Sequence, residues 1–337
     1  MKRFLLFICI IASIAGCKNG DATFPDFEYT SGYFPYQFPV RTLVLGDDIY
    51  DNTNDNAHRF VISVAMGGVY ENNVNRVFSI EVDESLCDQV SFGGSDNPIR
   101  PLPRAYYTLS SDNQITIPKG EMNGGITVQL TDAFFADPDA IGLNYVVPIR
   151  LTGSSDVDTI LNGRTSRPDA DVRFAGDWDE APKNFTMFGI KYINEFHGTY
   201  FHYGECTVKD AAGTTIDEKR YIADYVEQNS TAKLVTTKRH QVSLSVPSQS
   251  ELMEGSLNLL LDFDGNSCTV STPEGSPLTV NGTGEFKKDA YSWGNKSRNG
   301  LELTYTVSDG THTYEAKDTF VVRDRGVVME VFTPQSL

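Results

Sequence analysis

Basic side chains are scarce in this sequence. It has 28 Lys and Arg residues against 45 Asp and Glu residues, which gives a formal net charge of −17 over 337 residues. A protein that binds the phosphate backbone of nucleic acid needs Lys and Arg to displace the counterions around that backbone. The charge balance therefore argues against a nucleic-acid-binding protein.

Cysteine and catalytic signatures are also sparse. The chain has five Cys residues, with no CxxC and no other spacing that is typical of metal ligands. It contains no GxSxG, no HExxH and no phosphate-binding glycine loop. We therefore expect no metal, no cofactor and no enzymatic activity. Cys206 and Cys268 would form a disulfide only if both lie in one domain, and buried free thiols are the favoured alternative.

Long apolar runs are missing except at the N-terminus. Lys2 and Arg3 precede the apolar residues 4–14, and Ala15, Gly16 and Cys17 follow them. A short apolar run behind positive charge is typical of a secretory signal and is too short to span a membrane. No second run of about 20 apolar residues follows.

The end of this leader resembles the lipobox of bacterial lipoproteins, in which the Cys is lipidated and becomes the first residue. The four residues concerned are Ile14-Ala15-Gly16-Cys17. We expect a signal peptide over 1–16, a lipid on Cys17 and a tether over 17–32. An ordinary signal peptide with an incidental Cys is the alternative. The mature chain would hang from membrane lipid and project into water.

Short alternating segments fill residues 33–160. A period of two with Gly-rich turns is typical of half-buried antiparallel strands. These strands and the lack of a long helical period predict an immunoglobulin-like β-sandwich. Pro148 would suit an edge strand or a bulge, because it has no N–H to donate. The predicted strands include 61–65, 78–82, 115–118, 126–130 and 145–151.

Residues 161–184 are polar, contain Gly and Pro and lack periodicity, so we interpret them as the connection between two domains. Residues 185–337 then contain about eight strands joined by short turns, including an Asp264-Gly265-Asn266 hairpin. That pattern predicts an antiparallel up-and-down β-barrel, and a second sandwich is the alternative. The fold class is all-β.

Three stretches carry a resemblance to a known family. They are FPDFEYTSGYFPYQFPVRTLVLGDD (Phe24 to Asp48), ITIPKGEMNGGITVQLTDAFF (Ile115 to Phe135, followed by YVVPIRLT) and WDEAPKNFTMFGIKYINEFHGTY (Trp178 to Tyr200). With the lipobox, they resemble the two-domain surface lipoproteins of Bacteroidetes that are encoded in polysaccharide-utilisation loci. The resemblance covers nearly the full chain.

That resemblance implies an immunoglobulin-like domain in front of one of several partners. Some relatives carry a chitinase-like hydrolase barrel, and others carry a lipocalin-like barrel or a jelly roll. A (β/α)₈ barrel needs about 200 residues or more with alternating helices, which residues 185–337 do not offer. A lipocalin-like barrel is therefore expected, in a surface glycan-binding accessory to an outer-membrane importer.

Aromatic residues are the candidates for glycan contact, because sugars present apolar faces that stack on aromatic planes. Trp293 with Tyr291 is the sharper candidate, and Trp178 is the second. Trp293 could instead plug the barrel, and Trp178 could pack at the domain junction. The residues His197, Tyr200 and Tyr203 could line the barrel mouth or simply form its first strand.

Two polar segments allow further hypotheses. Residues 47–56 (DDIYDNTNDN) are rich in oxygen ligands and could hold Ca²⁺, but a solvated loop is favoured. Asp158-Thr159-Ile160 resembles the acceptor motif for O-glycosylation of exported Bacteroidetes proteins, with Thr159 as the acceptor.

The function expected from all this is a lipid-anchored, cell-surface protein of the outer membrane. It would bind an oligosaccharide or polysaccharide and work with an importer complex, without cutting the sugar. A structural or adhesive surface protein and a hydrolase or lyase remain alternatives. Neither the glycan nor the importer can be named from the residues.

Overall fold

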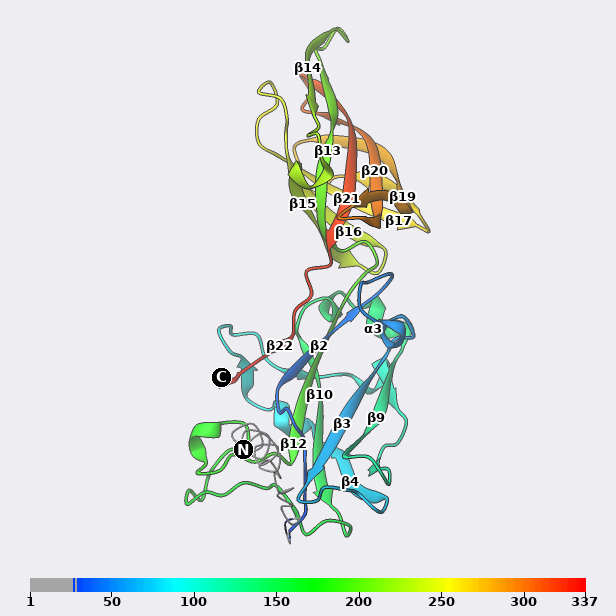
Figure 1. Ribbon diagram of the computed structural model, residues 1–337. Helices are drawn as coiled ribbons and strands as arrows, with labels where there is room; N and C mark the ends of the chain where they lie inside the picture. Colours follow the sequence, from blue (N-terminus) through cyan, green and yellow to red (C-terminus); the bar gives the residue numbers. More distant parts are fainter. Residues whose placement is uncertain (1–26, 28) are drawn as a thin grey trace, which may run out of the picture.

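Two β domains lie end to end in the structure, a computed structural model that describes residue 27 and residues 29–337 (Figure 1). The first is sandwich-like, with two curled sheets, and the second is a closed antiparallel barrel. The predicted fold class is thus confirmed. Cys17 and most of the predicted tether lie outside the described residues. Within the described part, no helix has the length and apolarity needed to cross a membrane.

The first sheet of the sandwich has five strands. Alternate residues of its long strands are buried, as a strand with one face on a core requires. In spatial order the strands are β11 (Thr159–Ile160), β1 (Ser31–Tyr33), β3 (Arg59–Gly67), β9 (Asn123–Leu130) and β7 (Tyr107–Leu109).

The second sheet has seven strands. Its order is β22 (Glu330–Val331), β2 (Pro39–Val44), β12 (Phe185–Ile193), β10 (Tyr145–Gly153), β4 (Arg76–Val82) and β8 (Gln114–Ile117), with β6 (Arg100–Pro101) paired to β10. A separate pair joins β5 (Val90–Phe92) to β23 (Pro334–Ser336). The helices are short: α2 (Thr53–Asn56), α3 (Asp132–Ala136) and 3₁₀ turns at Glu84–Cys87, Arg104–Tyr106, Pro138–Ala140, Ala175–Asp177 and Val226–Gln228.

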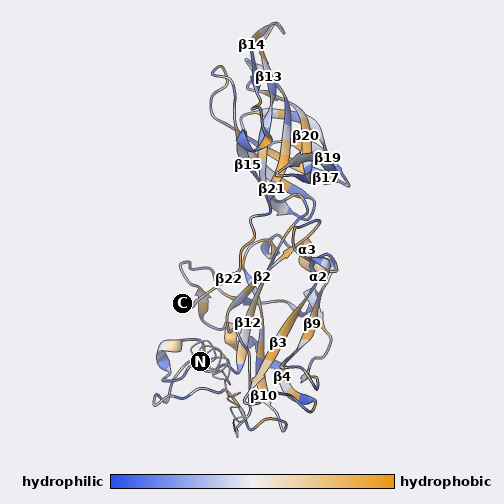
Figure 2. Ribbon diagram, viewed as in Figure 1, coloured by the Kyte–Doolittle hydropathy of each residue, from blue (hydrophilic) through white to orange (hydrophobic). Residues whose placement is uncertain are grey.

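The two sheets enclose one apolar core. Val64 and Val128 of the first sheet and Phe78 and Val147 of the second are fully buried in it. Figure 2 shows the corresponding hydrophobic residues along the strands of both domains. Burying one such side chain contributes about 1.5–3 kcal/mol, so this cluster is what holds the sheets face to face.

Pro148 lies in an interior strand. β10 pairs with β12 on one side and with β4 and β6 on the other, so the prediction of an edge strand or a bulge at this residue is wrong. The register with β6 covers Tyr145 and Val146, and the register with β4 begins at Ile149. The Pro148 carbonyl faces this side, because it accepts from Asp83 N at 3.1 Å. The missing N–H therefore falls in the gap between two partners, where no ladder bond is needed.

The barrel has eight strands and is closed by the pairing of its first strand with its last. The strands are β13 (Gly198–Lys209), β15 (Ser230–Lys238), β16 (Gln241–Pro247), β17 (Ser256–Asp264), β18 (Ser267–Ser271), β19 (Thr279–Trp293), β20 (Lys296–Ser308) and β21 (Thr313–Asp324). A ninth strand, β14 (Thr215–Tyr221), pairs with the far end of β13. The predicted Gly265-Asn266 turn joins β17 to β18.

Apolar side chains fill the barrel interior. Three of these side chains, Tyr200, Leu234 and Leu301, are each at most 1 % exposed. Cys206 and Cys268 belong to the same core, and both are free thiols, as the favoured alternative expected. Burial raises the pKa of the Cys268 thiol to about 12. The interior is therefore a packed core.

The domain boundary differs from the expected one at residue 185. β12 runs parallel to β2 and antiparallel to β10, which places Phe185–Ile193 in the first domain. Residues 161–184 are therefore a loop of that domain, and the connection to the barrel is 194–197. Alternation along a strand shows that one face is buried, but it does not show which sheet the strand joins.

The chain also returns to the first domain after the barrel. β22 pairs with Pro39 and Val40 of β2, and β23 pairs with β5. The expectation that the barrel extends to residue 337 is thus wrong. In Figure 1 this segment runs from β21 down beside β2 to the C-terminus. Two connecting segments of the chain therefore pass between the domains.

Arg325 lies where these two crossings meet, and it is 8 % exposed. Its Nε donates to His197 O at 2.7 Å, and its Nη1 donates to Asp47 O at 2.7 Å. Its Nη2 donates to Leu45 O at 3.0 Å and to Asn194 O at 2.6 Å. One guanidinium thus joins a loop of the first domain to both connecting segments.

A second contact joins the domains at the turn between β15 and β16. Arg239 of this turn lies over the Phe135 ring at 4.4 Å, and its Nη2 is 3.0 Å from His58 Nε2. Burial and the Arg239 charge lower the pKa of His58. A neutral His58 can accept a hydrogen bond from Arg239 through Nε2, so the two side chains can lie in contact without a carboxylate between them.

We expect Arg325→Met to lower the free energy of unfolding by about 3 kcal/mol or more, because four buried carbonyl oxygens lose their donor. Urea unfolding followed by tryptophan fluorescence measures the change. Arg220→Met is the control, because Arg220 is exposed on β14. A loss below about 0.5 kcal/mol for Arg325→Met would mean that the contact between the two domains does not depend on this side chain.

Candidate functional site

A cavity of about 790 Å³ lies between the two domains, and we call it the junction pocket. One wall comes from the loop after β2, another from the β19–β20 hairpin and a third from the end of β21. The lining residues are Asp47, Asp48, Ile49 and Asn52, then Asp289, Trp293, Lys296, Ser297, Arg298 and Asn299, then Val322, Arg323, Asp324 and Arg325. A second cavity of about 500 Å³ shares Asp48, Ile49, Asn52, Asp324 and Arg325 with its lining.

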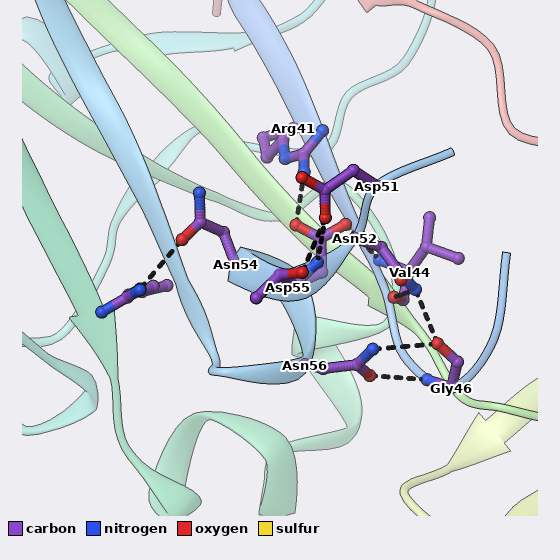
Figure 3. A network of polar contacts seen from close by, with 10 residues as sticks. Arg41, Val44, Gly46, Asp51, Asn52, Asn54, Asp55 and Asn56 are labelled. Atoms are coloured by element: carbon purple, nitrogen blue, oxygen red, sulfur yellow. Dashed lines mark hydrogen bonds and ion pairs between the residues drawn. The ribbon is translucent and has the colours of Figure 1, made fainter. Parts of the chain in front are cut away.

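The loop wall is held in shape by its own side chains (Figure 3). Asp55 is 1 % exposed and accepts from Val44 N at 3.0 Å. Asn52 Nδ2 donates to Val44 O at 2.9 Å and to Gly46 O at 2.6 Å. Asn56 Oδ1 accepts from Gly46 N at 2.8 Å. These side chains bond to the backbone that they shape, much as Asx turns do.

The oxygen-rich segment 47–56 is therefore not simply solvated. Asp55 also forms an ion pair with Arg41 of β2. Within residues 29–337, no group of three or more His, Cys, Asp or Glu side chains is placed to hold a metal ion. The segment serves as a rigid wall of the junction pocket.

Trp293 forms the aromatic part of the pocket and is half-buried. Its Nε1 donates to Val322 O at 2.9 Å, and its ring meets Phe201 edge-on with centroids 5.3 Å apart. The Arg298 guanidinium lies 4.1 Å from the ring centroid. These contacts fix the orientation of the indole, so that it forms a rigid surface on the pocket wall.

Tyr291 and Tyr203 lie near Trp293 on the outer face of the barrel. Tyr291 Oη donates to Glu302 Oε1 at 2.6 Å, and its ring covers Gly300, where a Cβ would lie 2.4 Å from the ring. Burial and the charge of Glu302 raise the pKa of Tyr203. The structure thus brings Trp293, Tyr291 and Tyr203 to one part of the barrel surface, but only Trp293 lines the junction pocket.

Tyr200 and His197 do not line an open barrel mouth. Tyr200 is 1 % exposed, and its Oη donates to Phe196 O at 2.7 Å. His197 Nδ1 accepts from Thr236 N at 3.0 Å. Burial and the charge of Arg325 lower the pKa of His197 to about 4. Both side chains stabilise the end of the barrel that faces the first domain.

Trp178 and Thr159 belong to the first domain. Trp178 Nε1 donates to Asp171 O at 2.8 Å within loop 161–184 of the first domain, so the indole packs in this loop rather than at the domain junction. Thr159 opens β11 and is partly exposed, and Asp158 beside it accepts from Thr30 N at 2.7 Å. The glycosylation of Thr159 stays a prediction, as does the lipid on Cys17.

Reasoning from sequence missed most of the pocket. Asp48, Arg298 and Arg323 come from three separate elements, and no motif links them. One signal was available for Arg298, because the β19–β20 hairpin pairs Tyr291 with Arg298 beside the pair of Trp293 and Lys296. A hairpin with two aromatic residues on one strand and two cations on the other is a recognisable pattern.

The barrel core also holds a cluster of polar side chains that the sequence did not reveal. Asp318 is 2 % exposed and accepts from Tyr305 Oη at 2.7 Å and from Tyr221 Oη. His202 Nε2 lies 3.1 Å from Asp318 Oδ1, the oxygen that also accepts from Tyr221. Burial and the Asp318 charge hold the pKa of Tyr305 well above its usual range. With both carboxylate oxygens engaged, this group acts as a structural element of the core.

Comparison with known proteins gives relatives for both domains. A family model described as an N-terminal domain matches residues 27–158, and the model described as domain of unknown function DUF5627 matches residues 195–326. The second range coincides with the barrel. No curated protein matches this chain.

Among solved structures, a Bacteroides ovatus protein of unknown function is 37 % identical, with a TM-score of 0.86 over 92 % of this chain and 100 % of its own. A multidomain protein including DUF1735, also from Bacteroides ovatus, is 10 % identical, with a TM-score of 0.44 over 88 % of this chain and 94 % of its own. The second likeness is too low to carry an argument.

We expect acid to weaken the folded state through His197. The pKa of His197 is about 4 in the folded chain and about 6.5 in the unfolded chain. As the pH falls from 6.5 toward 4, the unfolded chain therefore takes up the proton first, and the folded state loses stability relative to it. Between about pH 6.5 and pH 4, the wild type should lose about 2–3 kcal/mol more than His197→Gln. Unfolding curves across this range measure it. His240→Gln, at an exposed position, should follow the wild type, and equal losses in His197→Gln and wild type would contradict the assignment.

Proposed function

The chain belongs to the same family as this Bacteroides ovatus protein, and from that premise we propose that it is a glycan-binding lipoprotein of the cell surface. It captures oligosaccharide or polysaccharide and does not cut it. Its partner is an outer-membrane importer complex. The barrel is of the lipocalin-like type in this proposal, with its binding site on the outside, at the joint with the first domain.

The junction pocket carries this proposal. Carbohydrate sites combine an aromatic plane with a few convergent polar groups in a concave site. The pocket offers the Trp293 indole beside carboxylate, amide and guanidinium groups, and its volume of about 790 Å³ suits two or three sugar rings. Rigid walls from both domains favour binding, because little order is lost when the sugar enters.

The charges in the pocket favour binding over hydrolysis. A glycosidase needs one carboxylic acid held neutral by burial beside a second, ionised carboxylate. Asp47 pairs with Lys288 at 3.0 Å and Asp324 pairs with Arg323 at 3.5 Å. Both of these carboxylates are about half exposed, and such groups are suited to accept hydrogen bonds from sugar hydroxyls.

The leader supports the proposed location. A lipid on Cys17 would hold the two domains at the outer membrane, where the tether lets the pocket face the surroundings. Anchoring near an importer raises the effective concentration of captured sugar at its entrance. This advantage requires no new contact between the proteins.

A panel of soluble and insoluble polysaccharides separates this function from its alternatives. We expect retention of the protein on at least one glycan, with no new reducing ends after prolonged incubation. Release of product would identify a hydrolase or lyase. Lack of affinity for every glycan together with self-assembly would favour a structural or adhesive protein.

Trp293→Ala should weaken binding of the retained glycan by about tenfold or more, because an aromatic anchor in a pocket carries much of the binding energy. Isothermal titration calorimetry measures the change. Trp178→Ala is the matched control, since its indole is held inside loop 161–184, and its affinity should stay within about twofold of wild type. Equal losses in the two variants would remove the pocket from the proposal.

A further inference from the structure

We propose that the junction pocket selects a sugar with an anionic substituent, a uronic acid carboxylate or a sulfate ester, and that Arg298 binds this group. The inference rests on the proposed function and names the class of glycan. It starts from an arginine whose charge the folded chain leaves uncompensated.

Arg298 is a partly buried cation without an acid partner in the described chain. Its guanidinium lies 4.1 Å from the centroid of the Trp293 ring, and its Nε is buried without an acceptor. Contact with an aromatic face orients a guanidinium, but its N–H donors, which lie in the plane of the guanidinium itself, stay unused. Those donors match a carboxylate or a sulfate in a two-point arrangement. A sugar that stacks near Trp293 would bring such a group within reach.

The neighbouring charges favour the same ligand. Lys296, opposite Trp293 in the hairpin, also has no carboxylate at ion-pair distance among the described residues. The carboxylates of Asp47 and Asp324 are neutralised by Lys288 and Arg323. Lys296 and Arg298 together outweigh Asp289, so the unpaired charges of the barrel wall are net positive, although the chain as a whole carries −17.

Arg325 adds a positive charge at the floor of the pocket. It is 8 % exposed, and its four hydrogen bonds all go to backbone carbonyls, while the charges of Asp48, Glu195 and Asp47 act on it from further away. A charge in such a poorly solvated place acts over a longer distance than one in water. An anion in the pocket would experience this field without displacing any of the bonds.

Two acids on the walls form no ion pair among the described residues, and they define the rest of the ligand. Asp48 Oδ1 accepts from Ile49 N at 2.6 Å, and Asp289 N donates to Asn299 Oδ1 at 3.0 Å at the hairpin bulge. Both can accept from hydroxyl groups. The pocket thus fits a ring with several hydroxyl donors and one anionic group, which describes an acidic sugar better than an inorganic anion.

The test compares matched short glycans by calorimetry, because the acidic surface of the chain would repel a long polyanion. One pair is trigalacturonate and its methyl ester. The other pair is a sulfated galactose oligosaccharide and its desulfated form. We expect the wild type to bind one charged form at least about tenfold more tightly than its neutral partner. The pair in which this occurs identifies the anionic group.

Arg298→Gln should remove that preference, lowering affinity for the charged form by about tenfold more than affinity for the neutral form. Arg298→Lys, which keeps the charge without the two-point geometry, should lie between. Arg220→Gln on β14 makes the same charge change far from the pocket and should match the wild type. Circular dichroism checks that each variant is folded.

Each result bears on one of the two claims. Equal affinity of the wild type for the charged and neutral forms, with binding lost in Trp293→Ala, overturns the anionic inference and leaves the proposed function standing. Equal losses for charged and neutral forms in Arg298→Gln also overturn it, because the arginine would then act only by orienting the indole. No binding of any glycan overturns both.

Discussion

The buried guanidinium of Arg325 is the interaction on which the arrangement of this molecule depends. Arg325 lies in one of the two segments that connect the domains, and its donors reach the other segment and a loop of the first domain. A guanidinium suits this place because its fixed fork can serve several carbonyls at once. The pocket between the domains keeps its shape only if these segments stay in register. The geometry of the site is therefore set by the joint and not by either domain alone.

The joint also explains why the site combines elements so far apart in the chain. The loop after β2 is shaped by Asn52, Asp55 and Asn56, while the opposite wall is a bent hairpin of the barrel. Neither wall forms a concave surface alone. The barrel interior is occupied by its own side chains. The cavity of about 790 Å³ lies instead outside the barrel, where surfaces of the two domains meet.

The sequence allowed much of the fold to be predicted because alternation of apolar residues is a local property. β3, β4, β9 and β10 and most of the barrel were recognisable in this way. The assignment of β12 to the barrel failed because its partner β2 lies far away in the chain, and pairing over such distances leaves no local trace. Trp293 was found because its residue type is distinctive. Arg298 and Arg323 were not, because only folding brings them together.

The last strands of the chain have a consequence for biogenesis. Because β22 and β23 complete sheets begun by β2 and β5, the barrel is an insertion within the first domain and not a module added to its end. As the chain emerges in order, the barrel can close before the first domain receives these strands. A product truncated between the barrel and β22 would therefore carry an intact barrel on an unfinished base.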